Sequence, residues 1–254
     1  MIESVLPARL ARNRRLTAAL AVLASAVRVR QWTKNLLLFA GLVFAAKLGD
    51  AVRWGDAWLA FAAYCAASSA AYLVNDVRDA ESDRLHPFKR RRPVASGRLR
   101  ASTALVLSAA LGAAAVAAAS ALGYPSLALL AGFLGLQLAY SFGLKRVVAL
   151  DVVAIAALFT IRAAAGAEAV DVRVSPWLLV CTALLAIFLA LAKRGGELRA
   201  VGDAGERSRP ALARYSLAYV NRLLVVVGLA TVAAYCVYAL GARDSPEEIG
   251  RAHV

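Results

Sequence analysis

Long runs of Ala, Leu and Val, separated by short polar connections, fill most of this chain. The runs contain about 20 residues each, roughly the length at which an α-helix crosses the hydrocarbon core of a bilayer. Seven such blocks can be drawn, at 35–49, 57–77, 101–121, 125–144, 148–168, 175–193 and 215–240. The pattern predicts a polytopic membrane protein.

Helices are expected in these blocks rather than membrane β-strands. The blocks are apolar without a break and lack the alternation of apolar and polar positions that a membrane barrel requires. The composition agrees, because 61% of the residues are hydrophobic and the mean hydropathy is +0.64, well above an ordinary soluble domain. The expected fold class is therefore all-α, a polytopic membrane helical bundle.

Charged residues are concentrated in the connections. The chain has 30 Lys and Arg against 16 Asp and Glu, a formal net charge of +14. The connection from Arg78 to Arg100 carries eight basic residues and the one from Lys193 to Arg214 carries six, whereas the turn at 122–124 has none. By the positive-inside rule the basic connections face the cytoplasm. We expect a multi-pass protein of the plasma membrane with its active site on the cytoplasmic side, and no nucleic-acid partner, because no soluble domain exists to hold a duplex.

The N-terminal segment and the cysteines carry no chemistry of their own in this interpretation. Residues 1–30 form a basic cytoplasmic segment, which lacks the small-residue cleavage site of a signal peptide. Cys65, Cys181 and Cys236 each lie alone inside an apolar block. We expect these cysteines to be packing residues.

Three carboxylates follow directly on the second block. Asp76, Asp79 and Asp83 are spaced by three and four residues, so they share one face if the helix continues, with Asn75 beside Asp79. Like charges at this spacing repel each other, and Mg2+ would relieve the repulsion because it commonly joins one or two carboxylates to substrate phosphates. Arginines just downstream would supply fork-shaped donors for further phosphate oxygens. The stripe predicts a Mg2+ site, with Asp76, Asp79 and Asp83 as ligands, and phosphate chemistry at a membrane boundary.

A simpler interpretation is a solvated helix end on which the acids pair with Arg78, Arg84 and their neighbours. That interpretation does not explain why Asn75 and Asp76 directly continue a hydrophobic membrane block. Phosphate chemistry is therefore favoured.

The same residues resemble a known family. The sequence Asn75-Asp76-x-x-Asp79-x-x-x-Asp83 resembles the N-D-x-x-D-x-x-x-D signature of the UbiA prenyltransferase superfamily. Three further motifs resemble its decaprenyl-phosphate phosphoribosyltransferase branch: Arg30-Gln31-Trp32-x-Lys34-Asn35, Asp83-Arg84-x-His86-Pro87-x-Lys89-x-x-Arg92-Pro93-x-Ala95-Ser96-Gly97, and Lys193-Arg194-x-x-Glu197-Leu198. The resemblance covers roughly residues 28–240.

A second polar cluster is expected around the start of the fifth block. Members of the superfamily commonly carry two aspartates four residues apart here, but this chain has Asp151 and then Ile155, which argues against a symmetric two-metal site. Arg162 lies eleven residues after Asp151, about 16 Å along a helix and close to the same face. A charge inside a membrane block is a functional candidate by default, and a buried structural ion pair is the alternative.

The resemblance implies a reaction. In it, 5-phosphoribose passes from phosphoribosyl diphosphate to a polyprenyl (decaprenyl) phosphate lipid in the bilayer, Mg2+ assists, and diphosphate is released, a step of cell-wall arabinan precursor synthesis. The candidate catalytic residues are Asp76, Asp79, Asp83 and Asp151. The candidate substrate-binding residues are Lys34, Asn75, Arg84, Lys89, Arg92, Tyr140, Lys145, Arg162, Lys193 and Arg194. The lipid phosphate is already an anionic nucleophile, so no strong general base is required, in keeping with only two histidines.

Two other functions remain open. A prenyltransferase of the same superfamily would use a prenyl diphosphate and an aromatic or other small acceptor, with the same metal chemistry. A transporter or non-catalytic scaffold would also contain charged helices, but it has no particular need for three stacked acids followed by a basic loop.

The last residues, 248–254, resemble translated adapter DNA more than a protein terminus, and we expect 241–254 to be a non-native tail. We therefore expect a catalytic domain at 31–240 that is truncated, with about seven helices present of the nine that the resemblance implies. Small residues, such as the Ala-rich stretch at 109–119, make a homo-oligomer possible, although such residues more often pack helices within one chain.

Overall fold

The computed structural model describes residues 17–44, 48–147, 149–173, 176–201 and 216–244. Predictions that fall elsewhere lie outside the described residues. They concern the arginines before residue 17, residues 202–215 of the basic connection after the sixth block, and residues 245–254 of the tail.

All regular elements in the described ranges are helical, as the apolar pattern predicts. A helix at Thr17–Ala26 comes first. It is followed by η1 (Val29–Phe39), α2 (Ala40–Phe44), α3 (Ala51–Arg78), α4 (Ala80–Leu85), η2 (Lys89–Arg91), α5 (Ala101–Ala121), α6 (Tyr124–Phe142), η3 (Leu144–Arg146), α7 (Leu150–Ala169), α8 (Pro176–Val201) and α9 (Leu217–Asp244). Six of these helices, α3 and α5 to α9, are long and apolar enough to cross a membrane. They correspond to the second to seventh predicted blocks.

The first predicted block, 35–49, is built differently. Its described residues form the end of the 3-10 helix η1 and the five-residue helix α2 instead of one long α-helix. Leu38 and Leu42 are fully buried in this stretch, and so is the polar side chain of Asn35. Apolar content predicted the burial, but it could not distinguish a short irregular pair of helices from a single span.

The chain forms two compact units. Unit 1 contains residues up to Thr33 together with Cys65–Ala115, and unit 2 contains Lys34–Tyr64 together with the residues from Val116 onward. Helices η1, α3 and α5 each contribute residues to both units.

The core of unit 1 joins α3, α5 and the segment before η1. Ala26, Leu73, Val94 and Ala104 form its buried centre. A polar anchor supports the same segment, because Trp32 Nε1 donates to Ser69 Oγ at 3.1 Å while that hydroxyl lies 2.8 Å from the carbonyl oxygen of Val27. Apolar packing and this anchor fix the residues around Arg28 on the face of α3.

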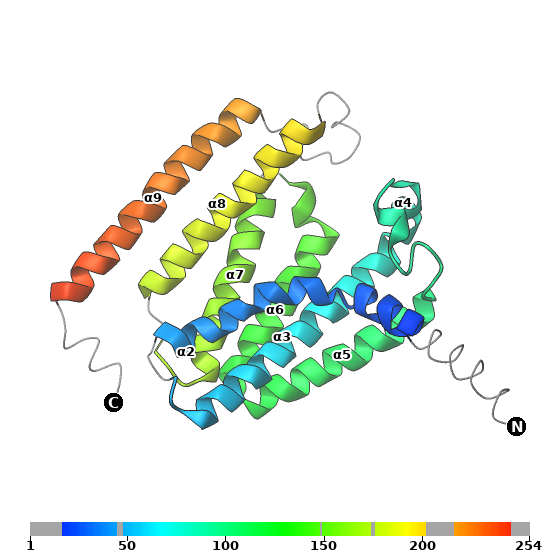
Figure 1. The fold of residues 1–254 in the computed structure, drawn as a ribbon, viewed down its shortest axis with the longest axis horizontal. Coiled ribbons are helices and arrows are strands. Elements are labelled where there is room, and N and C mark those ends of the chain that lie inside the picture. Colours follow the sequence, from blue (N-terminus) through cyan, green and yellow to red (C-terminus); the bar gives the residue numbers. More distant parts are fainter. Residues whose placement is uncertain (1–16, 45–47, 148, 174–175, 202–215, 245–254) are drawn as a thin grey trace, which may run out of the picture. The chain divides into compact units, whose positions relative to one another are not determined.

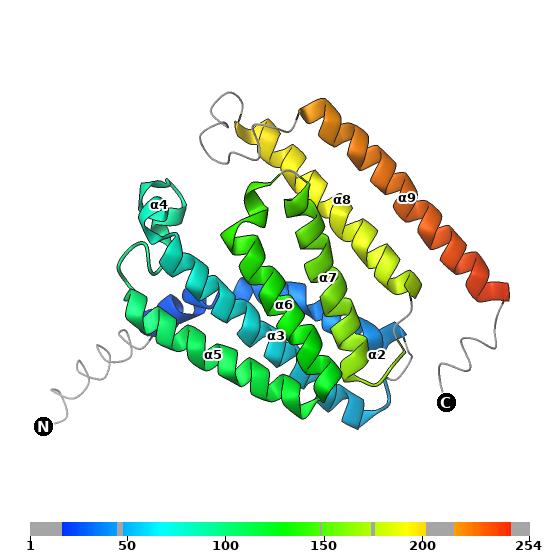
Figure 2. The same cartoon turned by 180° about the vertical axis from the view of Figure 1, so that it is seen from behind.

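Unit 2 is a helical bundle in which α7, α8 and α9 lie next to one another in that order, as both ribbon views show (Figures 1 and 2). Val152 of α7 packs with Ala190 and Leu191 of α8, and leucines of α9 cover them. The segment Lys34–Phe44 approaches α7 so closely that a Cβ atom at Gly166 would overlap the backbone of Leu38. Glycine is required at this crossing because no side chain fits there.

Asp50 caps the N-terminus of α3. The backbone N–H of Arg53 and that of Val52 both donate to the Asp50 carboxylate, which is the usual way in which an aspartate caps a helix N-terminus. The Arg53 amide, more than any other group, lowers the pKa of Asp50 from its usual value. Arg53 in turn bonds the carbonyl oxygens of Val170 and Asp171 at the end of α7, so this end of unit 2 is tied by polar contacts.

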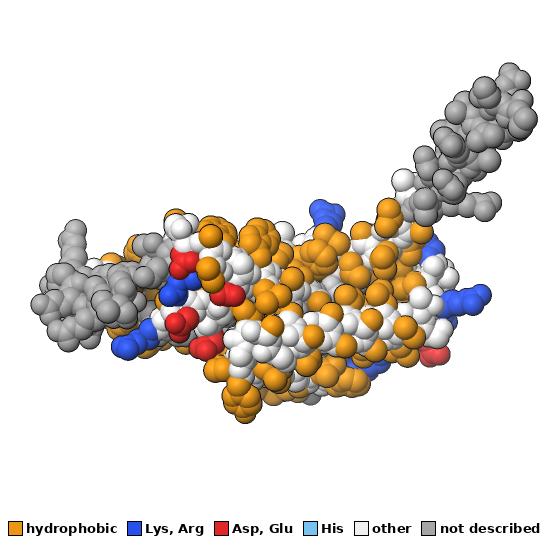
Figure 3. Space-filling view, turned by 90° about the horizontal axis from the view of Figure 1, so that it is seen from below, with side chains coloured by type: hydrophobic (Ala, Val, Ile, Leu, Met, Phe, Trp, Pro, Cys, Tyr) orange, Lys and Arg blue, Asp and Glu red, His pale blue; other side chains and the backbone are white. Residues whose placement is uncertain are grey.

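Apolar side chains are widely exposed on the described helices. Exposed large apolar residues include Val225, Val226 and Leu229 of α9, and orange apolar side chains cover most of the face drawn in Figure 3 while charged side chains gather in patches. A soluble protein rarely exposes so much contiguous apolar surface. The exposure agrees with helices that meet lipid.

Candidate functional site

Asp76 and Asp83 are brought together in unit 1 as the spacing predicts. Helix α3 ends at Arg78 and α4 begins at Ala80, yet the helical pattern of bonds continues through the junction, because the amide of Asp83 donates to the carbonyl of Asp79 at 2.8 Å. Both carboxylates therefore stay on one face. Both residues are almost fully buried.

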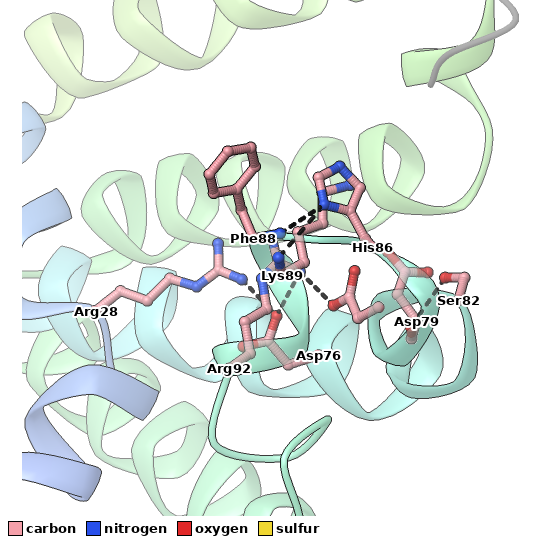
Figure 4. A network of polar contacts seen from close by, with 9 residues as sticks. Arg28, Asp76, Asp79, Ser82, His86, Phe88, Lys89 and Arg92 are labelled. Atoms are coloured by element: carbon pink, nitrogen blue, oxygen red, sulfur yellow. Dashed lines mark hydrogen bonds and ion pairs between the residues drawn. The ribbon is translucent and has the colours of Figure 1, made fainter. Parts of the chain in front are cut away.

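Two arginines from outside the helix, Arg28 and Arg92, converge on Asp76 (Figure 4). Arg92 Nη1 lies 3.1 Å from Asp76 Oδ1 and 2.6 Å from Asp83 Oδ2. Arg28 Nη2 donates to the same Asp76 Oδ1, and its guanidinium lies over the Tyr72 ring, 4.5 Å from the centroid. We call Arg28, Asp76, Asp83 and Arg92 the Asp76 cluster.

The donor set of the Asp76 cluster fits a divalent cation bound together with a phosphate. In the described parts of the chain no three Asp, Glu, His or Cys side chains lie together as a metal-binding group. Mg2+ does not need three, since it typically uses one or two carboxylates plus waters and phosphate oxygens. Asp76 and Asp83 both present a carboxylate oxygen to Arg92 Nη1, so these two residues would hold such an ion.

Asp79 and Asn75 are the two other polar residues of the predicted stripe. Asp79 occupies the junction of α3 and α4 with φ −89° and ψ 7°, and its carbonyl accepts a hydrogen bond from the Ser82 hydroxyl at 2.9 Å. Asn75 is half-buried on α3. The predicted metal role of Asp79 stays a prediction.

The predicted basic residues of α4 and of the loop after it have different contacts. Arg92 joins the carboxylates, whereas Arg84 is exposed and its Nε lies 3.3 Å from the carbonyl oxygen of Ala95. Lys89 begins η2 and is half-buried. His86 acts locally, because its Nδ1 accepts hydrogen bonds from the amides of Phe88 and Lys89 (Figure 4).

A second group of ionic residues lies in unit 2, with Asp151 and Arg194 buried and Glu197 half-buried. Arg194 Nε lies 2.8 Å from Asp151 Oδ2, and Arg194 Nη1 lies 2.6 Å from Glu197 Oε2. The Lys193 ammonium is mostly exposed, 4.0 Å from Glu197 Oε1. Tyr140 lies close enough to Arg194 to interact with it electrostatically. We call Asp151, Arg194 and Glu197 the Asp151 cluster.

Arg162 is buried inside unit 2, and the contacts described for it are to neutral groups. Its Nε donates to Asn35 Oδ1 at 2.7 Å, and its Nη1 donates to the Leu158 carbonyl at 3.0 Å. The guanidinium lies over the ring of Phe133, 4.6 Å from the centroid. These contacts join the segment after Lys34 to α6 and α7, and the predicted contact of Arg162 with substrate stays a prediction.

The two remaining predicted residues are Lys34 and Lys145. Lys34 is exposed on η1, and Lys145 is half-buried on η3. Both belong to unit 2.

The sequence interpretation did not name Arg28 and Glu197 as members of the two clusters, nor Asn35 as the partner of Arg162. Arg28 stands just before the motif that begins at Arg30, and Glu197 and Asn35 are themselves letters of the quoted motifs. Arg28 and Asn35 meet their partners 48 and 127 residues away in the chain, so only the fold could assign them. Glu197 lies three residues from Arg194, and this helical spacing was a local signal.

Comparison of the sequence with protein families gives one match. The model of the UbiA prenyltransferase family matches residues 35–203. The decaprenyl-phosphate phosphoribosyltransferase of Mycolicibacterium smegmatis is 36% identical over 231 residues, which are 89% of this chain and 72% of that protein. The protein of the same name from Corynebacterium glutamicum is 32% identical over 235 residues, 89% of this chain and 69% of that protein.

Solved structures with a similar fold include UbiA homologues. A UbiA homologue from Archaeoglobus fulgidus, solved with GPP and Mg2+, superposes with a TM-score of 0.73 at 18% identity, over 91% of this chain and 84% of that one. At this identity the likeness concerns the fold, and it confirms the predicted helical bundle.

Proposed function

The chain belongs to the UbiA prenyltransferase family and is a transferase of the membrane, and from that premise we propose that it transfers 5-phosphoribose from phosphoribosyl diphosphate to a polyprenyl phosphate, with Mg2+ as cofactor. The relatives that carry this activity in their name match most of the chain. The single observation that supports the chemistry is the convergence of Asp76 and Asp83 on one arginine nitrogen.

Asp76 and Asp83 would hold the Mg2+ ion in this proposal, with Asp79 next to them in the chain. When bound, Mg2+ neutralises the diphosphate and so makes it a better leaving group. The buried position of Asp76 and Asp83 keeps their charges close to the ligand and poorly screened, which strengthens every interaction that they make with it.

Cationic side chains would take the rest of the negative charge. In the transfer the bond between the sugar C1 and the diphosphate oxygen breaks, the diphosphate leaves with the electron pair, and a phosphate oxygen of the lipid forms the new bond to C1. Arg92 and Lys89 are candidates to donate to the departing diphosphate, and Lys145 and Lys193 to bind other phosphates. Donors that are in place before charge develops are the most effective stabilisers.

Asp151 has a different task in the proposal. Asp151 is a candidate to stabilise the positive charge that builds at C1 as the leaving group departs. Asp151 is buried and held by Arg194, so its orientation is fixed before substrate arrives. No residue needs to remove a proton, because the lipid phosphate attacks as an anion.

The orientation follows from the charges of the connections. The basic residues between Arg78 and Arg100 would lie in the cytoplasm, where a soluble phosphorylated sugar is available, and the plasma membrane would supply the lipid. The exposed apolar helices provide the surface along which a polyprenyl chain could lie.

The proposal is tested by supplying two donor–acceptor pairs to membranes that contain the protein. We expect label from phosphoribosyl diphosphate in the lipid fraction when polyprenyl phosphate and Mg2+ are present. Product from a prenyl diphosphate and an aromatic acid, without labelled phosphoribosyl lipid, would instead select the rival prenyltransferase function. If neither pair gives a product, the result would favour a transporter or a non-catalytic scaffold.

A further inference from the structure

Arg28 is a member of the Asp76 cluster to which the proposed reaction assigns no task. Its backbone has φ 55°, in the left-handed region that residues other than glycine rarely adopt. It follows closely on the helix Thr17–Ala26, and the residue that adopts this conformation after a helix is usually glycine. An arginine at such a position indicates that its side chain is needed there.

The side chain is held over the carboxylate from outside α3. The ring of Tyr72 supports the guanidinium from below, and the bond from Trp32 to Ser69 fixes the backbone that follows. Arg28 is thus presented to Asp76 by a segment of the chain 48 residues away.

The contact between Arg28 and Asp76 is of a kind that a ligand can replace. Asp76 Oδ1 accepts from both Arg28 and Arg92, and each guanidinium reaches this carboxylate through one nitrogen, without the paired fork that makes arginine–carboxylate contacts strong. The Arg28 side chain is 22% exposed, so a soluble ligand can reach it. The guanidinium donors that bind a carboxylate bind a phosphate equally well.

We propose that Arg28 is an exchangeable counter-ion that becomes a diphosphate ligand. It neutralises Asp76 while the site holds no ligand. In the presence of Mg2+ and diphosphate, Arg28 would release the Asp76 carboxylate, which would then be available to hold the ion, and would donate to a diphosphate oxygen. The inference rests on the proposed function, since the metal–diphosphate pair is the ligand that drives the exchange.

Two binding constants separate this role from a structural one. Without Arg28, a divalent ion alone meets one competing positive charge fewer and binds more tightly. Diphosphate bound with the metal loses one donor and binds less tightly. A side chain that only supported the fold of unit 1 would weaken both when removed.

The experiment uses the full chain, purified in lipid nanodiscs, with Mn2+ as a spectroscopic probe because Mn2+ accepts the same oxygen ligands as Mg2+. Free Mn2+ is measured by electron paramagnetic resonance, and inorganic diphosphate is titrated by calorimetry in the presence of Mn2+. We expect Arg28→Gln to bind Mn2+ alone about fivefold more tightly and diphosphate about tenfold more weakly. Arg98→Gln is the matched control, because Arg98 is an exposed arginine of the same unit that donates to Ser96 Oγ and the Arg91 carbonyl.

An Arg28→Gln protein that binds Mn2+ no more tightly than the unsubstituted protein overturns the inference. Should that variant fail to fold, Arg28→Lys retains the charge but loses the planar fork, so diphosphate affinity should fall about threefold while Mn2+ affinity stays; equal diphosphate affinity then overturns it. Absence of any Mn2+ binding to the unsubstituted protein would sink the metal part of the proposed function as well, whereas normal binding with an indifferent Arg28→Gln variant contradicts the role of Arg28 alone.

Discussion

The Asp76 cluster of unit 1 and the Asp151 cluster of unit 2 contain the same kinds of side chain, but their arginines are buried to different extents. In each, one arginine contacts two carboxylates at 2.6–3.1 Å. The bridging side chain of the first, Arg92, is 27% exposed, whereas that of the second, Arg194, is 3% exposed.

The difference in burial indicates which arginine a ligand could displace from its carboxylates. A buried ion pair that loses one partner leaves a charge without water or counter-ion, which costs far more than the pair itself contributes. A half-exposed arginine can be replaced on its carboxylates by another cation, because water solvates the guanidinium during the exchange. We therefore interpret the Asp76 cluster as a ligand site and the Asp151 cluster as a fixed support that orients Asp151.

Neutralising the first cluster should have the largest effect. Asp76→Asn removes the charge of one of the two carboxylates that contact Arg92. We expect turnover to fall about 10^3-fold. The melting temperature should change little, since the asparagine can still accept from Arg28. Asp56→Asn on the same helix is the control and should retain turnover; loss of turnover in both variants would show that α3 tolerates no such change.

Removing each bridging arginine should separate the clusters by their response to Mg2+. Arg92→Met and Arg194→Met should each lower the free energy of unfolding by about 3 kcal/mol in chelator, because buried carboxylates lose a partner. Millimolar Mg2+ should restore about 1 kcal/mol to Arg92→Met alone, by binding the folded state. Denaturant titrations with and without Mg2+ measure this, and equal recovery in both variants would break the comparison.

The smallest effect is expected at Lys193, which is exposed beside the buried arginine. Lys193→Gln should change the free energy of unfolding by less than about 0.5 kcal/mol, since exposed ion pairs contribute little. If Lys193 binds phosphate as proposed, the KM for phosphoribosyl diphosphate should rise several-fold at unchanged kcat. Arg199→Gln, which removes an exposed contact with Asn221, serves as control and should change neither constant.

The acidic stripe was predictable because it is local. The residues at 76 and 83 are close in the chain, and helical geometry alone predicts that they share one face, as they do in the structure. The opposite holds for Arg28 and Asn35, whose partners Asp76 and Arg162 are far away in sequence. Spacing also could not predict that Arg84 turns to a backbone carbonyl while Arg92 bridges two acids, because both arginines belong to the same basic run.

The amino-acid sequence by itself determined the class of the molecule. Apolar blocks long enough for a bilayer predict helices, since hydrocarbon tolerates no unpaired backbone groups, and the motif around Asp76 predicts the family. Tertiary structure alone decided which cations meet which acids and how deeply each pair is buried. Burial depends on every neighbour at once, and it is burial that distinguishes an arginine that a ligand can displace from one that must stay.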